Sequence, residues 1–363
     1  MPAAAGIGVL GLVLVVAGGL FDAEALYVPG VALAALGAAL PAWVRAAADG
    51  AGVSRMLDTR RVEEEAPLGV VLEATPGRLP PLSATVEDPL LRRAVPVTLG
   101  AGPARVRLSV RFARRGRRHL EPPRLMLGDP LGLTLRAVGG ADEDEVLVLP
   151  RTTPVRALRD GDAERAGPSA VLLAAFAASE VDGLRPYREG APAARIHWPA
   201  VARGAGLVER RMRPDGDARP LVVLDPRGAA STEDLDAAVR ATASLALALA
   251  RAGGCALLLP GERRATALDG DLGAWPAAHA RLALVEDSPT SGPPPVGDAR
   301  RGALFLVAAA GRSELPPAMQ AAARGARMLV VPRPIAGRVP VFEVAGCHGY
   351  ELAARRARVP VAG

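Results

Sequence analysis

The residues whose types and spacing are best suited to chemistry lie between positions 180 and 211. His197 is one of only four histidines in the chain and stands beside Trp198, and three carboxylates, Glu180, Asp182 and Glu189, precede it. A histidine that a carboxylate orients works as a general base. One hypothesis is therefore a hydrolase or a transferase that uses His197 with Glu189 or Asp182. Because no Ser or Cys motif supplies the nucleophile of a covalent reaction, we favour a His197 that packs against Trp198.

A second pair of catalytic side-chain types is formed by Cys347 and His348. Adjacent residues of a strand point to opposite faces, so a thiol and an imidazole in this order are not expected to act together. Cys255 lies in the apolar run CALLL and is expected to be a small buried hydrophobic residue. The cysteines match no metal-binding spacing, and a chain without lysine lacks a phosphate-binding loop of the Gly-Lys type. The sequence therefore predicts a non-catalytic protein without a cofactor.

Composition limits the remaining functions. The 363 residues are enough for two or three domains with a buried core. The net charge of +6 comes entirely from arginine, and aromatic residues make up only 3% of the chain. A surface that binds single-stranded nucleic acid combines basic patches with aromatic side chains on which bases stack. Because such patches are missing, no nucleic acid is expected among the partners.

Two uncharged apolar runs at the amino terminus predict a transmembrane hairpin over residues 1–48. The runs span residues 3–21 and 25–44, and the short step between them carries Asp22 and Glu24. Each run is close to the roughly 20 residues that cross a bilayer. The first run lacks the basic residues that open a signal peptide and is followed at once by another span. Two buried core helices remain the alternative.

Arginine flanks one end of this hairpin, at Arg45, Arg55, Arg60 and Arg61. Arg and Lys near transmembrane segments are enriched on the cytoplasmic side. We therefore expect a multi-pass protein of the cell membrane that has the lipid bilayer as a partner. Both ends of the hairpin and the soluble domains are expected in the cytoplasm.

Residues 49–61 are interpreted as a linker and residues 62–150 as a small antiparallel β-sandwich. The clearest strand spans residues 105–112, where apolar side chains alternate with Arg and Ser. Frequent Pro and Gly between short strands favour a sandwich. The arginines between 114 and 118 are interpreted as a solvated hairpin tip, with contact to anionic headgroups as the alternative. The further candidate strands are 69–74, 95–99, 131–138 and 146–149.

After a connector at residues 151–218, strand-like and helix-like runs alternate over residues 219–363. An apolar run at 221–224 precedes Asp225, and the helix expected at 234–251 has Ser231 among its capping residues. This alternation predicts an α/β fold with an open, mostly parallel sheet. The other expected strands are 255–259, 265–268, 304–308, 328–331 and 341–344, and the other expected helices are 275–284 and 314–323.

The segment 185–203 resembles the signature of the domain of unknown function 58 family, a group of bacterial membrane-anchored proteins. The family pattern is Arg-x-Tyr-x-x-Gly-Asp-x-x-Arg-x-Ile-x-Trp followed by an Ala-Arg step. Ala191 replaces the Asp of that pattern, and Ala194 replaces the first Arg of the usual pair. Two shorter elements also resemble the family, Arg115-Gly116 with His119-Leu120 and the turn Asp129-Pro-Leu-Gly-Leu133. The resemblance assigns a binding surface to Arg185, Tyr187, Gly190, Arg195, Ile196, His197, Trp198 and Arg203.

This resemblance implies a von Willebrand factor A-like α/β domain after the sandwich. It also implies an interaction or scaffold protein that partners a MoxR-type AAA+ ATPase in envelope assembly. Von Willebrand factor A domains bind a hard divalent cation through an Asp-x-Ser-x-Ser sequence. Here the sequence reads Asp225-Pro-Arg227-Gly-Ala229, so both serines are lost and Arg227 brings a positive charge to the metal position. A degenerate metal site is expected at Asp225, and metal-dependent adhesion there is the alternative function.

Overall fold

The computed structural model divides the chain into two compact units. The first comprises residues 1–113 with 117–148, and the second comprises residues 114–116 with 149–363. The residues that the structure describes are 2–100, 102–140, 143–158, 184–187, 196, 198–202, 204, 206–210, 219–287, 296, 302–323 and 325–352.

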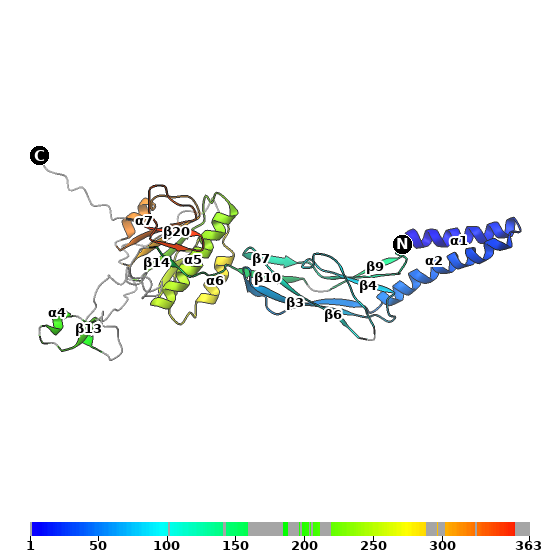
Figure 1. The fold of residues 1–363 in the computed structure, drawn as a ribbon, viewed down its shortest axis with the longest axis horizontal. Coiled ribbons are helices and arrows are strands. Elements are labelled where there is room, and N and C mark those ends of the chain that lie inside the picture. The colour runs from blue at the N-terminus through cyan, green and yellow to red at the C-terminus, as the bar shows by residue number, and fades with distance from the viewer. Residues whose placement is uncertain are drawn as a thin grey trace. The chain divides into compact units, whose positions relative to one another are not determined.

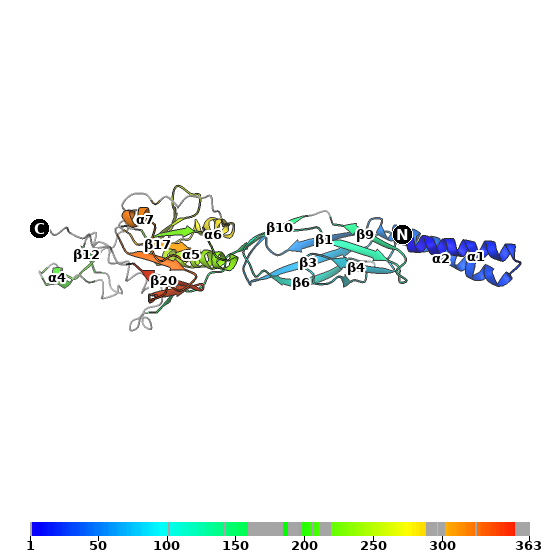
Figure 2. The ribbon, with the colours of Figure 1, turned by 90° about the horizontal axis from the view of Figure 1, so that it is seen from above.

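The first unit begins with two long helices that lie side by side as a hairpin (Figures 1 and 2). Helix α1 spans Pro2–Leu20, a short 3-10 helix η1 spans Glu24–Leu26, and α2 spans Tyr27–Ala48. Both helices are long and apolar enough to cross a membrane. Their apolar side chains are largely exposed, unlike those of a core helix in a soluble protein. The exposed side chains include Val9, Leu12, Val16, Leu20, Phe21, Val28 and Val31.

The two helices approach closely where small residues face each other. A Cβ atom added to Gly11 would lie 2.3 Å from the backbone nitrogen of Ala34. A Cβ atom on Gly37 would lie 2.5 Å from the Cα atom of Gly8. Larger side chains at these positions would push the backbones apart, so glycine is what permits this contact.

Short strands in three sheets form the rest of the first unit. The sheet orders are β1-β3-β6, β2-β10-β7 and β5-β4-β8-β9. The pairings of β1, β3 and β6 and those of β5, β4, β8 and β9 are antiparallel. The strands are β1 (Gly52–Leu57), β2 (Arg61–Glu63), β3 (Pro67–Thr75), β4 (Ser83–Glu87), β5 (Val95–Pro96), β6 (Ala104–Arg111), β7 (Gly116–Leu120), β8 (Arg124–Gly128), β9 (Leu135–Gly139) and β10 (Asp144–Leu149).

Alternating side chains build the core of this unit. Along β3, every second residue from Leu68 to Ala74 is buried, as a strand with one face on a core requires. Val44 of α2 belongs to the same apolar cluster, so the second helix continues into the β-rich part. The other buried members include Leu125, Leu127, Val146 and Val148.

Two sequence predictions for this unit were wrong. Residues 49–61 were expected to be a linker, whereas Gly52–Leu57 form β1 and pair with β3. The signal was hidden because Arg55 occupies an inward position of this strand. The strand expected at 131–138 begins only at Leu135, because the carboxylate of Asp129 accepts backbone hydrogen bonds that fold the preceding residues into a turn.

The second unit is built on an eight-stranded mixed sheet. Its order is β11-β19-β20-β18-β17-β14-β15-β16. The central strands β15, β14, β17 and β18 are parallel, whereas β16, β20, β19 and β11 join antiparallel. The strands are β11 (Arg156–Ala157), β14 (Leu221–Asp225), β15 (Cys255–Leu258), β16 (Thr266–Leu268), β17 (Leu304–Ala308), β18 (Arg327–Val331), β19 (Phe342–Val344) and β20 (Cys347–Glu351).

The expectation of a mostly parallel sheet was therefore wrong for β19 and β20, whereas the antiparallel pairing of β16 with β15 is the hairpin that the turn at Pro260 and Gly261 predicts. The cause is a tight turn at Ala345 and Gly346, which both have positive φ angles and connect β19 directly to β20. Positive φ at two successive residues is the geometry of a two-residue β-hairpin turn. This unit also contains helices α5 (Thr232–Ala252), α6 (Trp275–Ala283) and α7 (Pro317–Ala322).

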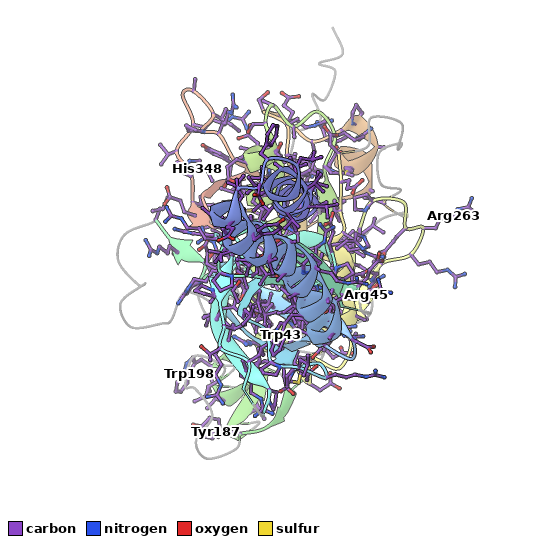
Figure 3. The ribbon with its side chains drawn as sticks, turned by 90° about the vertical axis from the view of Figure 1, so that its right-hand side faces the viewer. Trp43, Arg45, Tyr187, Trp198, Arg263 and His348 are labelled. Atoms are coloured by element: carbon purple, nitrogen blue, oxygen red, sulfur yellow. The ribbon has the colours of Figure 1, made fainter. Side chains whose placement is uncertain are left out.

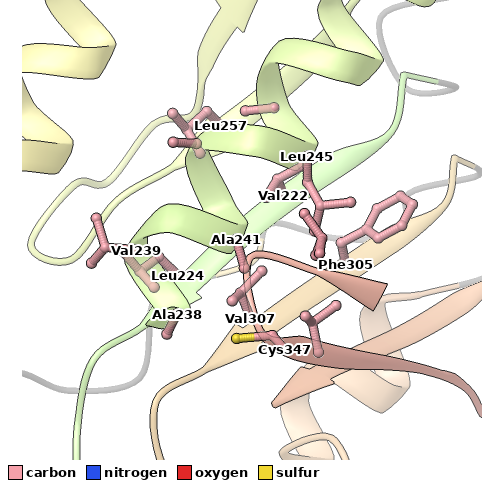
Figure 4. Packing of buried hydrophobic residues seen from close by; sticks show 14 of the residues in the cluster. Val222, Leu224, Ala238, Val239, Ala241, Leu245, Leu257, Phe305, Val307 and Cys347 are labelled. Carbon is pink, nitrogen blue, oxygen red and sulfur yellow. The ribbon is translucent and has the colours of Figure 1, made fainter. Parts of the chain in front are cut away.

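Both faces of the central strands are buried, which explains their continuous apolar sequences. Val222 and Leu224 of β14 belong to the same apolar cluster as Leu245 of α5 (Figure 4). Leu221 and Val223 belong to the cluster on the opposite face, with Met319 of α7. The fully buried β14 thereby places Asp225 at a fixed point at the end of the sheet.

Candidate functional site

The segment that carries the family-like signature contributes a small antiparallel strand pair. Strand β12 (Leu184–Pro186) pairs with β13 (Val208–Arg210), with Arg185 opposite Glu209. Tyr187 is half-buried, and its backbone nitrogen donates to the carbonyl oxygen of Leu207 over 2.9 Å.

A short helix, α4 (Trp198–Val201), follows within this segment. Trp198, labelled in Figure 3, is 60% exposed, whereas Ile196, two residues earlier in the sequence, is buried. Gly190, Arg195, His197 and Arg203 lie outside the described residues, as do Asp182 and Glu189. The hypothesis of a His197-based reaction therefore stays a prediction.

Asp225 occupies the position in the second unit where α/β folds place ligands. It ends β14, which has β15 on one side and β17 on the other, so the order of the strands reverses at this point. Ligands of open α/β sheets bind outside the carboxyl ends of the strands at such a reversal. The Asp225 side chain is fully buried, and its backbone oxygen accepts a hydrogen bond from Ala309, just after β17, over 2.9 Å.

Two guanidinium groups hold the carboxylate of Asp225. The Nε atom of Arg227 lies 2.7 Å from Oδ1, and a terminal nitrogen of the same side chain lies 2.9 Å from Oδ2. A terminal nitrogen of Arg312 lies 3.3 Å from Oδ2. Gly228 has a φ of 70°, and this left-handed turn directly follows Arg227. The forked contact of Arg227 is the strong bidentate form of an ion pair.

The electrostatics of Asp225 follow from these neighbours. Burial alone would raise the pKa of the Asp225 carboxyl group, but the hydrogen bonds and charge of Arg227 and the charge of Arg312 lower it below the usual value of 3.8. The carboxylate is therefore ionised at neutral pH. The sequence indicated the contact from Arg227, two residues away, but not the contact from Arg312, which follows the loop after β17.

These residues do not fit a divalent cation. Such a cation needs several oxygen ligands, and here both oxygens of the single carboxylate contact guanidinium groups. Arg227 and Ala229 stand at the two serine positions of the metal motif. Within the part of the chain that the structure describes, no group of three or more His, Cys, Asp or Glu could hold a metal ion.

Further ion pairs line the start of α5, beside this site in the sequence. The hydroxyl oxygen of Ser231 accepts a hydrogen bond from the backbone of Asp234 over 3.1 Å and caps the helix, as predicted. Asp234 pairs with Arg333 at 2.8 Å, and Glu233 pairs with Arg240 at 2.8 Å.

The interpretation of residues 114–118 as a solvated hairpin tip was wrong for two arginines. Arg114 and Arg115 lie 3.0 Å and 3.2 Å from the carboxylate of Asp236 on α5. Arg115 is buried and also donates to the carbonyl oxygen of Val285 over 3.0 Å. A buried carboxylate needs paired charges, and these two arginines supply them.

The cysteines are not nucleophiles in this structure. Cys255 and Cys347 are both buried, and burial raises the pKa of each thiol to about 12. A thiol with such a pKa is almost entirely protonated at neutral pH and unreactive. The imidazole of His348 lies 3.2 Å from the carboxylate of Glu343, a residue directly opposite it on β19. The prediction that Cys347 and His348 do not form a catalytic pair is consistent with this placement.

Comparisons with known proteins give only weak likenesses. No family model matches the chain, and no curated protein matches its sequence. A CARDB domain from Pyrococcus furiosus, solved in complex with di-metal ions, gives a TM-score of 0.21 at 12% identity over 27% of this chain and 87% of that chain. A PKD domain of an M14-like peptidase from a Thermoplasmatales archaeon gives 0.19 at 10% identity over 27% of this chain and 92% of that chain.

A third solved structure overlaps a longer part of the chain. Cwp6 from Clostridium difficile gives a TM-score of 0.17 at 9% identity over 70% of this chain and 33% of that chain. Scores of this size identify neither a fold family nor a function.

Proposed function

We propose that the protein is a membrane-anchored interaction protein of the domain of unknown function 58 type, which partners a MoxR-type AAA+ ATPase in envelope-related assembly. The observation that carries the proposal is the Asp225 site. It lies where an α/β sheet binds ligands, yet its carboxylate is neutralised by arginine and is not free for catalysis or metal binding. A site of this composition recognises a partner instead of transforming a substrate.

Strand order supports the von Willebrand factor A-like fold of the second unit. The order β16-β15-β14-β17-β18-β20, with β16 antiparallel at the edge, is that of a doubly wound sheet whose second and third strands form a hairpin. In the first unit, antiparallel sheets around a single apolar cluster support the β-sandwich.

The charge at Asp225 favours an acidic partner. Two guanidinium groups face one carboxylate, so the cluster carries one positive charge in excess. The side chains of Arg227 and Arg312 are partly exposed, at 21% and 33%, and so remain accessible to an incoming group. Arginine matches the planar geometry of a carboxylate and binds it in a forked manner. An Asp or Glu side chain of the ATPase is the ligand that complements this cluster.

Exposed apolar helices support the membrane anchor. The helices α1 and α2 present apolar side chains outward along their length, and their backbones touch through glycine. The close packing favours a two-span hairpin over a cleaved signal sequence, because a signal sequence is removed and needs no partner helix. Three exposed arginines favour a cytoplasmic location of the soluble units: Arg45 in the last turn of α2, and Arg60 and Arg61 after the helix.

Purification from native membranes tests the partnership. Full-length tagged protein is solubilised in detergent, and the amount of co-purified MoxR-type ATPase is measured for wild type, Arg312→Glu and Arg263→Glu. Arg263 is exposed on the hairpin between β15 and β16 and serves as the matched control for lost charge. A charge-assisted hydrogen bond contributes about 1.5–3 kcal/mol, so Arg312→Glu is expected to lower recovery at least about tenfold while Arg263→Glu leaves it unchanged.

Thermal unfolding of each variant in the same detergent separates lost binding from lost folding. Equal recovery with Arg312→Glu and wild type would contradict the role of the Asp225 site. If no ATPase co-purifies with the wild-type protein, the partnership itself is wrong.

A further inference from the structure

Four apolar side chains remain exposed at the end of the first unit from which α2 extends. They come from the last part of α2, from the loop before β4, from the turn between β8 and β9, and from the first residue of β9. The residues of this apolar patch are Trp43, Leu82, Leu131 and Leu135, and the two last are 63% and 59% exposed.

The strand register brings these side chains to one edge. Ser83 pairs with Gly128, and Gly128 pairs with Leu135, so Leu82 and the turn after Gly128 lie at the same end of their sheet. Two strand spacings separate Leu82 from Leu135, which corresponds to about 10 Å.

Helix α2 contacts this same end. It lies against β8 and β9 (Figure 2), and the indole nitrogen of Trp43 donates to the carbonyl oxygen of Pro80 over 3.0 Å. Pro80 belongs to the loop that leads into Leu82. The apolar patch is therefore continuous with the helix that we propose to cross the membrane.

Local hydrogen bonds fix Leu131 in its outward position. The buried carboxylate of Asp129 accepts hydrogen bonds from the backbone nitrogens of Leu131 at 2.8 Å, Leu133 at 3.3 Å and Thr134. Burial opposes the ionised form of Asp129, but these donors lower its pKa below the usual 3.8. The turn is thus held by three hydrogen bonds to one side chain, with Leu131 exposed on it.

The spacing of aromatic residues along α2 indicates where the edge of the first unit that carries the apolar patch lies relative to the membrane surface. Tyr27 and Trp43 are 16 residues apart, which corresponds to about 24 Å along a helix, somewhat less than the roughly 30 Å of a hydrocarbon core. Tyr and Trp are enriched at both membrane surfaces. Trp43 therefore marks one surface, and the apolar patch lies beside it.

Two exposed arginines lie at the same end of the first unit as the patch. Arg45 is exposed in the last turn of α2, two residues after Trp43 (Figure 3). Arg78 is exposed in the loop before β4, where its Nε atom lies 3.1 Å from Asp49. Apolar side chains at the boundary between headgroups and acyl chains, with arginine at the phosphates, form an interfacial anchor.

We propose that the apolar patch inserts into the interfacial layer of the bilayer and holds the first unit against the membrane surface. This inference rests on the proposed membrane anchor, but it adds a contact outside the two helices. The occupant is lipid, because the patch continues directly from α2 and because the exposed side chains of Arg45 and Arg78 lie at the same end of the first unit.

Fluorescent labelling tests this contact. Leu131→Cys and, as the matched control, Met56→Cys are labelled with an environment-sensitive dye in full-length protein reconstituted in phosphatidylethanolamine–phosphatidylglycerol vesicles. Met56 is also exposed in the first unit and lies about 13 Å beyond Gly52 along β1. The two native cysteines are buried with raised thiol pKa values and are not expected to react.

The expected result is a blue-shifted emission for the label at Leu131, with stronger quenching by spin-labelled lipids than by a water-soluble quencher. The label at Met56 is expected to show the reverse. Flotation of the vesicles is measured on the same samples. Protein that floats while both labels respond only to the aqueous quencher overturns the interfacial contact alone. Protein that does not float overturns the membrane anchor and this inference together.

Discussion

Arg55 brings a positive charge into the interior of the first unit. Its side chain has no exposed surface and lies 2.8 Å from Asp88 and 2.8 Å from Asp144. It also donates to the carbonyl oxygens of Leu120 and Glu121. The guanidinium thereby connects β1 to the end of β7, to the start of β10 and to the loop after β4, all of which are far away in the sequence. A buried charge is tolerated only when its partners satisfy it in this way.

Replacement of Arg55 by Met is expected to destabilise the protein by about 3–5 kcal/mol, because it leaves buried carboxylates without their partner. Thermal or denaturant unfolding in detergent measures the loss. Arg60→Met is the control. Arg60 is 80% exposed and its distance to Asp144 is long, at 4.0 Å. Exposed ion pairs of this kind contribute no more than about 1 kcal/mol. Similar losses in the two variants would contradict a structural role for the buried network.

Arg227 controls the ionisation of Asp225. In the wild-type protein the folded-state pKa of Asp225 lies below its usual 3.8, so the stabilising contribution is present above that pH and is lost as the pH falls through the folded-state value. Arg227→Gln removes the guanidinium that counteracts the effect of burial on Asp225, so the pKa of Asp225 rises. A buried, ionised Asp225 without this partner then lowers the stability of the folded protein most at neutral pH.

The drop in Tm caused by Arg227→Gln is therefore expected to be larger near pH 7 than near pH 3, because below the unfolded-state pKa the wild-type protein has lost part of the stability that the ionised carboxylate contributes. Thermal scans at both pH values measure it. Arg263→Gln, on an exposed loop, should give the same small change at each pH. A drop for Arg227→Gln that does not vary with pH would show that Arg227 acts through packing alone.

Sequence reasoning at the residue scale worked where partners are close in the chain. Arg227 lies two residues from Asp225, so the replacement of a metal by a guanidinium was readable from the motif. Arg312 contacts the same carboxylate from another loop, and no local pattern indicated it. From the sequence, Arg55 was interpreted only as a positive charge that flanks a membrane span. Its partners Asp88 and Asp144 are far away in the sequence and come close only in the folded protein.

Hydrophobic periodicity predicted most helices and strands. It missed strands in which a residue other than an apolar one occupies an inward position. Strand β17 was predicted with the observed bounds because five consecutive apolar residues bury both faces. Strand β20 was missed, since Gly349 and His348 interrupt its pattern. Gly349 lies under the ring of Phe342 on β19, and a Cβ atom there would be 2.3 Å from that ring. Glycine is needed at this position because of a contact with the neighbouring strand, and the sequence of one strand alone does not reveal such a contact.

The glycine contacts between α1 and α2 predict a position-specific effect. Gly11→Leu is expected to force the helices apart and to destabilise the hairpin by about 1–3 kcal/mol, because the added side chain meets the backbone of Ala34. Gly6→Leu on the same helix is the control, since nothing lies within 4 Å of its Cβ position. The midpoint of thermal aggregation in detergent measures both. Equal midpoints for the two variants would show that the helices do not pack in this manner.

At the scale of the whole molecule, composition gave the order of the parts. Charge-free runs, short alternating strands and a βα alternation follow one another in the sequence, and the structure contains apolar helices, antiparallel sheets and a mixed α/β sheet in that order. The boundary between the two units was less readable. Residues 114–116 belong with the second unit through the contacts of Arg114 and Arg115 to Asp236, which lies on a helix more than a hundred residues later.

Membrane orientation gives the final prediction. Fusion of green fluorescent protein after Gly363 is expected to yield fluorescent cells, and fusion of alkaline phosphatase at the same place is expected to be inactive, because arginines that flank the end of a membrane span favour the cytoplasmic side. An alkaline phosphatase fusion after Asp22, in the step between the helices, should be active and serves as the control. Active phosphatase after Gly363 would place the Asp225 site outside the cell, where a cytoplasmic ATPase has no access to it.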